Sequence, residues 1–275
     1  MATNILFVFE GENTEKLIVN SLENHFLKRN MIGSTIIKCA FAAEIYQLYR
    51  KIKEDADFDT FNLIKERNSN NRESLKEYDR SDFAEIYLFF DYDAHSSLAS
   101  SQDQLGNPVK SGDEKLEDML TLFDNETDKG KLYISYPMVE ALRHIKDYNT
   151  LYELTVKCKG KNCKNIDDCE DKEDCLEEPH YRERVSNESI PQLCNINGYT
   201  NETWKQLIKA HLLKMNYIVN NNFEYPEAIE SQLNIFLKQL EKYINMPCPK
   251  VSILSAFPVF IHDYYGNNKT KELIY

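Results

Sequence analysis

The sequence has few of the residues that interrupt regular structure, and it has no long apolar run. Only 8 of its 275 residues are glycine and 8 are proline, which argues against long disordered tracts. No apolar run approaches the ~20 residues that a membrane-spanning helix requires. The opening residues lack the basic start, apolar centre and small-residue cleavage site of a secretion signal. We therefore expect a cytoplasmic globular protein with no membrane partner.

Positive charge is also scarce. The chain carries 33 Lys and Arg against 45 Asp and Glu, a formal net charge of -12 at pH 7. Proteins that bind nucleic acid use Lys and Arg to neutralise phosphates, so this balance counts against a nucleic-acid partner. Metal ions held by a local acidic cluster would cancel part of the charge. The acidity therefore disfavours such a partner without excluding it.

Strand-like and helix-like segments alternate over residues 1–155. Short apolar runs typical of buried strands precede stretches whose apolar residues recur at helical spacing. Because this alternation is typical of a mostly parallel sheet with helices on both faces, we predict an α/β fold. The expected strands are 5–9, 34–41, 85–90 and 131–136, and the expected helices are 14–29, 43–53, 113–123 and one that begins at Pro137 and carries Glu140 and His144.

The rest of the chain departs from this pattern. A charged, cysteine-rich stretch is followed by two segments with helical spacing, 203–219 and 226–244, and we expect His211 in the apolar stripe of the first. The apolar segment 251–264 is β-like, although Pro258 interrupts it. We therefore divide the chain into an α/β domain, an insert, and a helical region that ends in a β-like segment. Their ranges are 1–155, 156–199 and 200–275.

Two acidic motifs directly follow predicted strands. Glu10-Gly11-Glu12-Asn13-Thr14-Glu15 follows the first, and Asp91-Tyr92-Asp93 follows the third. A buried carboxylate without a partner charge is costly because it loses its hydration. The carboxyl ends of parallel strands meet at one edge of the sheet, and hard cations prefer oxygen ligands. We therefore predict that Glu10, Asp91 and Asp93 bind Mg²⁺ or Mn²⁺ at that edge.

Two further acids are candidates for the same site. Glu15, in the first turn of the following helix, would be a ligand for a second ion, and Glu140 follows the next strand. Both have an ordinary alternative reading, because acids in a first helical turn complement the helix dipole. An Asp-x-Asp motif alone is also a weak signal. The order, strand context and spacing together favour a site.

These motifs resemble the Toprim family, the metal-dependent catalytic domain of topoisomerases, bacterial primases and several nucleases. The family pattern is a Glu-Gly at the end of the first strand and an Asp-x-Asp at the end of a later one. Here these are Glu10-Gly11 and Asp91-Tyr92-Asp93. The longer string Val8 to Lys16 is similar to Toprim domains of bacterial anti-phage nucleases, including OLD-type enzymes. The resemblance covers residues 1 to about 155.

The resemblance implies a magnesium-dependent nuclease that cleaves DNA or RNA, including tRNA, in anti-phage defence. Glu10 would act as general acid, general base or metal ligand, Asp91 and Asp93 would bind the metal, and Glu15 would match a second acid of OLD-type enzymes. Such domains often work with an ATPase or another defence partner. The chain has no G-x-x-x-x-G-K-[ST] motif, so another chain would have to supply any ATP site.

The sequence departs from the family in two ways. No tyrosine stands out as a topoisomerase nucleophile. The basic residue that OLD-type enzymes carry late in the domain has no clear match, and Lys214 and Lys250 are the candidates.

Cysteines cluster in the insert. Cys158, Cys163, Cys169 and Cys175 are separated by four, five and five residues. Four thiolates suit tetrahedral Zn²⁺, although no pair has the tight C-x₂-C spacing. The alternative is a solvated loop with incidental thiols, but exposed thiols are reactive liabilities. We predict a structural zinc site.

Two other functions fit part of the pattern. Phosphatases of the haloacid-dehalogenase kind also end a strand with Asp-x-Asp, but they place that motif first, whereas here it follows Glu10-Gly11. A Toprim-like module that binds a partner protein or a nucleotide without cleaving is the second alternative. The net acidity favours this module, and the presence of Glu10, Asp91 and Asp93 argues against it.

Overall fold

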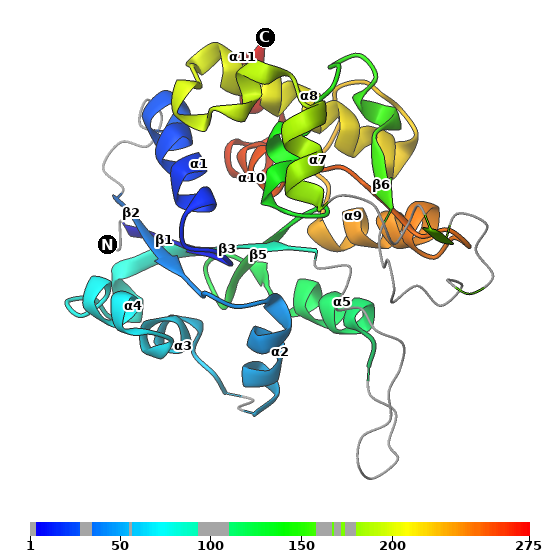
Figure 1. Cartoon of the computed structure of the whole chain (residues 1–275). Coiled ribbons are helices and arrows are strands. Elements are labelled where there is room, and N and C mark those ends of the chain that lie inside the picture. Colours follow the sequence, from blue (N-terminus) through cyan, green and yellow to red (C-terminus); the bar gives the residue numbers. More distant parts are fainter. Residues whose placement is uncertain are drawn as a thin grey trace.

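The structure, a computed structural model of the chain, is an α/β fold built on a mostly parallel sheet (Figure 1). The described residues are 4–27, 35–54, 57–92, 110–157, 167, 172–173 and 180–275. Among them, five strands pair in the order β2-β1-β3-β5-β4, and only β4 is antiparallel to its neighbour. The strands are β1 Asn4–Phe9, β2 Thr35–Ala40, β3 Phe83–Asp91, β4 Asp124–Asn125 and β5 Gly130–Ser135.

The central strands β1 and β3 are neighbours. Their residues are apolar on both faces, and a strand of this kind is stable only where helices cover the sheet on both sides. In the register of the pair, Phe9 lies opposite Phe89. The residues that follow the two strands therefore emerge side by side at one edge of the sheet, as the sequence predicts for Glu10 and Asp91.

Helices cover both faces of the sheet (Figure 1). The helices on one face are α2 Ile45–Glu54, α3 Thr60–Glu66, α4 Ser69–Ser74 and α5 Gly112–Leu122, and those on the other include α1 Thr14–Leu22 and α10 Ala256–Tyr265. The helices predicted at 43–53 and 113–123 correspond to α2 and α5. Ser111 caps α5 by accepting a hydrogen bond from the amide of Glu114, whose side chain accepts one from the amide of Ser111.

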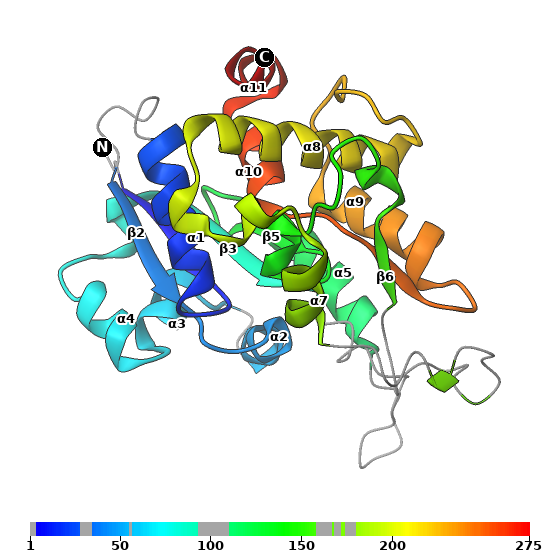
Figure 2. The same ribbon diagram turned by 45° about the horizontal axis from the view of Figure 1, so that its top comes forward.

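The C-terminal region packs directly on the sheet. The ring of Phe257 in α10 stacks on that of Phe89 in β3, with their centroids 4.8 Å apart. Helix α8, Asn201–Asn220, lies across α10 and reaches the end of α1, where the Trp204 indole donates a hydrogen bond to the Ser21 hydroxyl at 3.1 Å (Figure 2). Residues on both sides of the predicted boundary at 155 therefore belong to one continuous apolar core.

The predicted β-like segment at the end of the chain is wrong over most of its length. Strand β7 covers only Lys250–Ser252, and α10 begins at Ala256. Pro258 is the third residue of this helix. The first amides of a helix have no partner within the helix, so a proline there removes no hydrogen bond. The apolar run is helical because its residues are buried between the sheet and α8.

The helix predicted from Pro137 is also shorter than expected. Only a 3₁₀ turn, η3 Val139–Arg143, follows β5, and Pro137 precedes it. The residues of this segment are buried on nearly every side, including Glu140 and His144. A helix of several turns at a protein surface keeps one polar face in water, and this segment has no such face.

The remaining described elements connect these parts. The helix predicted from Pro226 begins at Gln232, where the Ser231 side chain caps it by accepting from the amide of Asn234. The remaining described elements are η1 Glu23–Leu27, η2 Arg80–Asp82, η4 Leu151–Glu153, β6 Thr155–Lys157, α7 Tyr181–Glu188, η7 Pro191–Cys194, η8 Ile196–Gly198, α9 Gln232–Gln239, η9 Leu240–Ile244, β7 and α11 Asn267–Ile274. Strands β6 and β7 pair antiparallel.

Candidate active site

Carboxylates from three adjacent strands meet at the carboxyl edge of the sheet. Glu10 follows β1, and Asp91 ends β3, where it lies opposite Ser135 at the end of β5. Glu140 lies in η3, just after β5. Asp91 is only 8% exposed and Glu140 only 4%. The sheet order alone therefore accounts for the gathering of three acids that are far apart in the sequence.

Glu10 is fixed to the neighbouring strand by two hydrogen bonds. Its amide donates to the Phe89 carbonyl at 3.0 Å, and its carboxylate oxygen Oε2 accepts from the amide of Asp91 at 3.0 Å. The first bond continues the β1–β3 ladder by one residue, and the second directs the Glu10 side chain toward Asp91. A carboxylate held in this way is preorganised to act on a ligand at this edge.

Glu15 folds back over the loop that links β1 to α1. Its Oε1 accepts a hydrogen bond from the amide of Gly11 at 2.9 Å, and its side chain is buried. A Cβ atom at Gly11 would lie 2.9 Å from both carboxylate oxygens of Glu15. The glycine of the acidic motif thus makes room for a second carboxylate of the same motif.

Glu140 forms an ion pair with Arg182. The Nε of Arg182, in α7, donates to Glu140 Oε1 at 2.8 Å, and the Arg182 side chain is 66% exposed. Among the described residues, no group donates to the other oxygen, Oε2, which is buried. A buried carboxylate oxygen without a donor is costly. This oxygen is therefore a candidate ligand for a cation.

The acids at this edge disturb the titration of Asp91. Burial is the main cause that raises the pKa of Asp91 well above its usual value. The negative charges of Glu10, Glu15 and Glu140 add to this shift, and the Arg182 guanidinium opposes it. A divalent cation at the edge would favour the ionised carboxylate, because a nearby positive charge stabilises the negative form.

A buried polar chain holds α7 against the sheet edge. The Tyr181 hydroxyl lies 3.1 Å from His144 Nδ1, and His144 Nε2 lies 3.1 Å from Glu188 Oε2. Burial lowers the pKa of His144, so the neutral imidazole is the favoured form. Burial is also the main cause that raises the pKa of Tyr181 well above its usual value, and the negative charge of Glu140 adds to this shift. Since Tyr181 precedes Arg182, this chain positions the guanidinium beside Glu140.

Sequence reasoning missed Arg182 and proposed other basic residues. Lys214 lies in α8 and is fully buried, where its Nζ donates to the carbonyls of Tyr152 at 2.8 Å and Leu154 at 3.0 Å. Lys250 is exposed in β7. Lys214 thus fixes the segment around η4, whereas Arg182 contacts Glu140 at the site. The sequence around Arg182 gives little signal, because Arg182 and Arg184 alternate with the acid Glu183 after the cysteines.

Several predicted residues lie outside the described part of the chain. These are Asp93 and the four clustered cysteines, Cys158, Cys163, Cys169 and Cys175. Within the described ranges, no group of three or more His, Cys, Asp or Glu side chains is arranged to hold a metal ion. One oxygen each of Glu10 and Glu15 accepts from a backbone amide, and Arg182 occupies one oxygen of Glu140. The binding of magnesium and the binding of zinc therefore stay predictions.

Comparisons with known proteins add no relative. No protein-family model matches the chain, and no curated protein or solved structure is significantly similar to it. The Toprim resemblance therefore stands on its short motifs alone. Among the described helices, none is long and apolar enough to cross a membrane.

Proposed function

We propose that the protein hydrolyses phosphodiester bonds of DNA or RNA with Mg²⁺ or Mn²⁺ at the carboxyl edge of the sheet. The observation that carries this proposal is the burial of Asp91 among Glu10, Glu15 and Glu140, whose combined negative charge the Arg182 guanidinium opposes only in part. Concentrated buried acid is costly to a fold and is typical of sites that bind a divalent cation.

The donor set suits a hard cation. Asp91, the buried Oε2 of Glu140 and, from the motif, Asp93 would hold the ion through oxygen atoms. When bound, Mg²⁺ would neutralise the phosphate and orient the attacking water. In the structure as it stands, Arg182 neutralises part of the charge that the ion would neutralise.

The residues of the chain would divide the chemistry among them. Glu10, held by two backbone hydrogen bonds, would take the proton of the water as its oxygen attacks phosphorus. The bond from phosphorus to the leaving oxygen then breaks, and that oxygen takes up a proton from solvent. Arg182, largely exposed beside Glu140, would bind the phosphate oxygens as their charge grows.

The test is cleavage of plasmid DNA and of total tRNA with Mg²⁺ or Mn²⁺. We compare the wild-type protein with Glu10→Gln and Asp91→Asn, which remove charge with little change of shape, and with Glu73→Gln, an exposed acid of an ordinary surface ion pair. We expect both site variants to lose at least about 100-fold in rate, and Glu73→Gln to keep full activity. Equal cleavage by all four proteins would mean a contaminating nuclease.

The alternative is a module with this fold that binds a partner protein or a nucleotide without cleaving it. The net charge of -12 favours it, since acidity weakens contact with nucleic acid. Wild-type protein that binds Mg²⁺, measured by calorimetry, yet cleaves neither substrate would support this alternative. The role in anti-phage defence and the ATPase partner rest on the Toprim resemblance and belong to the same proposal.

A further inference from the structure

The tyrosine in the middle of the Asp-x-Asp motif is buried and hydrogen-bonded to a helix. Tyr92 directly follows Asp91, and none of its surface is exposed. Its hydroxyl donates to Oδ1 of Asp113, in the first turn of α5, at 2.7 Å. The function proposed above uses neither Tyr92 nor Asp113. This bond joins the end of β3 to a helix that begins much later in the sequence.

The backbone and the ring of Tyr92 are also held. Its amide donates to the Ser135 carbonyl at 2.9 Å, which extends the β3–β5 ladder by one residue. Its ring centroid lies 5.7 Å from that of Tyr136 and 6.2 Å from that of Phe236 in α9. These contacts leave the side chain few other positions, so its hydroxyl meets Asp113 in a defined geometry.

The acceptor of this bond has a fixed place as well. Asp113 belongs to α5, which Ser111 caps and which is anchored by the buried side chains of Leu116 and Met119. An acid in a first helical turn has an ordinary role, because it complements the helix dipole. That role requires no buried tyrosine as a donor, so it does not account for the contact with Tyr92.

An anchor on one face of the sheet sets the direction of a carboxylate on the other. Phe89 packs on α10, and alternate residues of a strand point to the same face, so Asp91 lies on the α10 face. Tyr92 points to the opposite face, where it meets α5. A shift of the Tyr92 side chain would therefore turn the backbone that carries Asp91. The Asp91 amide also donates to Glu10 Oε2, so the position of Glu10 depends on the same backbone.

The acids at this edge require such a hold because they repel one another. The negative charges of Glu10, Glu15 and Glu140 all act on Asp91. Repulsion of this kind favours an opening of the strand end, which is the part of a strand that frays most easily. A cation binds tightly only to oxygens that are already in place, and residues that orient metal ligands typically account for about 10–100-fold in affinity.

We propose that Tyr92 and Asp113 are positioning residues whose hydrogen bond fixes the Asp91 carboxylate at the edge of the sheet. The ligand for which Asp91 is fixed, a divalent cation, rests on the proposed function. Neither Tyr92 nor Asp113 touches the cation. The hydroxyl acts on Asp91 through the backbone of Tyr92, and Asp113 acts through the hydroxyl.

A second tyrosine–aspartate bond on α5 provides a matched control. The Tyr49 hydroxyl, from α2, donates to Oδ2 of Asp118 at 2.9 Å. Tyr49→Phe and Tyr92→Phe therefore remove the same group from a bond to the same helix. Only the second of these bonds starts from the end of β3.

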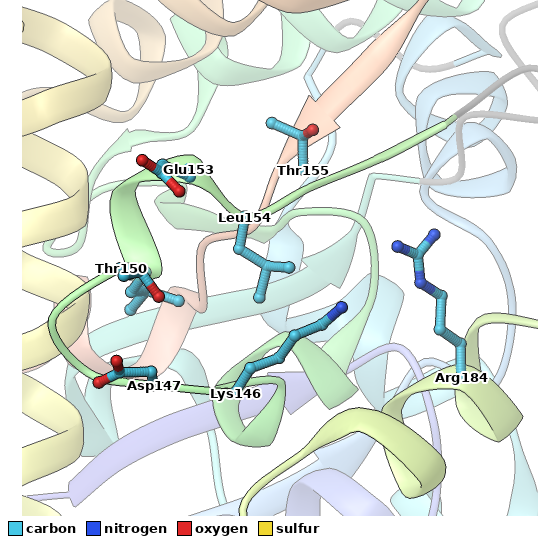
Figure 3. Close-up of a pocket in the computed structure, with 8 residues that line it drawn as sticks. Lys146, Asp147, Thr150, Glu153, Leu154, Thr155 and Arg184 are labelled. Atoms are coloured by element: carbon cyan, nitrogen blue, oxygen red, sulfur yellow. The ribbon is translucent and has the colours of Figure 1, made fainter.

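A polar hollow beside α7 provides another control. It has a volume of about 260 Å³, and Figure 3 shows the side chains around it. Two cations, Lys146 and Arg184, and two acids, Asp147 and Glu153, line it. Thr150 lies in the same lining, so Thr150→Val removes a hydroxyl group from a polar recess that is not part of the carboxylate site.

The first measurement is amide hydrogen exchange, followed by NMR on metal-free protein in EDTA. We expect Tyr92→Phe and Asp113→Ala to speed the exchange of amides 91 and 92 roughly fivefold, the effect of one lost hydrogen bond, and to spare the β1–β2 ladder. Asp113→Asn keeps an acceptor oxygen and should retain the wild-type rate. The double variant should match Asp113→Ala alone, because both changes break one bond.

The second measurement is Mg²⁺ binding by calorimetry in the absence of substrate. We expect Tyr92→Phe and Asp113→Ala to weaken binding about tenfold, whereas Asp113→Asn, Tyr49→Phe and Thr150→Val leave it unchanged. Thermal melting of all variants gives their stability separately. A bond that served only to hold α5 would speed exchange in the first turn of this helix and leave Mg²⁺ affinity unchanged.

Each outcome has a defined meaning. Unchanged exchange of amides 91 and 92 in Tyr92→Phe would overturn the positioning role, and so would wild-type Mg²⁺ affinity in that variant. Faster exchange of these amides, in a protein whose wild type binds neither Mg²⁺ nor Mn²⁺, would keep the positioning of Asp91 and overturn the cation of the proposed function. Weaker Mg²⁺ binding in the variants of a protein that cleaves no nucleic acid would keep the positioning role and overturn hydrolysis.

Discussion

The carboxylate of Glu15 lies so close to Gly11 that a Cβ atom at position 11 would be 2.9 Å from both of its oxygens. Gly11 therefore makes room for the Glu15 carboxylate because it has no side chain. Its amide also donates to Glu15 at 2.9 Å, so the loop backbone and the buried acid hold each other in place. The Glu-Gly pair of the motif and its later acid are one structural unit.

Gly11→Ala should displace the Glu15 carboxylate. We expect the rate of metal-dependent cleavage to fall strongly, while the free energy of unfolding changes little. We expect a loss of about 1 kcal/mol in the free energy of unfolding, since the clash is with the end of a side chain. Urea denaturation and cleavage assays measure the two effects. Gly198→Ala is the control, because its Cβ would meet no atom closer than 3.4 Å. Equal effects of the two changes would show that Glu15 has no special place in the site.

Asp91→Asn should stabilise the metal-free protein while it abolishes cleavage. A carboxyl group with a raised pKa takes up a proton on folding, so its contribution to stability falls as the pH rises above 3.8, the ordinary value for Asp. An amide removes that loss, and we expect a gain of about 0.5–2 kcal/mol at pH 7 in EDTA. Mg²⁺ should then raise the melting temperature of the wild type and leave that of the variant unchanged.

Asp118→Asn is the control for that experiment, because the pKa of Asp118 is shifted in the opposite direction to that of Asp91. Hydrogen bonds from Lys110 are the main cause that lowers the pKa of Asp118, so its charge is stabilising in the folded protein. Removing this charge should give no gain in stability. A gain as large as that of Asp91→Asn would mean that the acids at the sheet edge carry no special repulsion.

Arg182→Gln should lower kcat about 100-fold with a smaller change in KM, because a guanidinium that binds the growing charge of the phosphate acts mainly in the transition state. Loss of this cation also leaves Glu140 without its charged partner. Mg²⁺ should therefore bind the variant at least as tightly as the wild type, by calorimetry. Arg72→Gln breaks an exposed pair with Glu66 and should change neither constant. A pure loss of stability with normal kcat would remove Arg182 from the chemistry.

Lys214→Met should flatten the dependence of stability on alkaline pH. Burial lowers the pKa of Lys214 to about 7 from 10.5, so between these values the unfolded chain binds more protons than the folded one. Stability should then fall as the pH is lowered from 10.5 to 7, by up to about 1.4 kcal/mol for each pH unit. Chemical denaturation across this range measures the slope. Lys205→Met, on a half-exposed position of the same helix, should keep the wild-type slope.

The purified protein should contain about one zinc atom per chain, held by the four clustered cysteines. Mass spectrometry of the metal content tests this, with Cys158→Ser combined with Cys163→Ser as the variant. Cys248→Ser, a free cysteine outside the cluster, is the control. Wild-type protein prepared without chelator that contains no zinc would refute the site.

The sequence was sufficient for those parts of the site that depend on strand order. Buried apolar strands that end in acids predict a parallel sheet, and the structure has Glu10 and Asp91 on neighbouring strands. Arg182 could not be predicted, because its contact with Glu140 depends on how α7 packs, and no local pattern encodes that packing. The β-like prediction for segment 251–264 was wrong for a related reason. A short apolar run suits a buried strand and a buried helix equally, and Pro258 is compatible with the first turn of a helix.

The packing of α10 on the sheet has a consequence for how the chain folds. The Phe260 ring lies 5.3 Å from that of Phe7, so the core beside the first strand is closed by a helix that is far from this strand in the sequence. Until α10 has packed, Phe7 and Phe89 lack the ring contacts that Phe260 and Phe257 supply. Contacts so distant in sequence slow folding, and exposed apolar surface promotes aggregation. We therefore expect the core of this sheet to form together with α10, in one cooperative step.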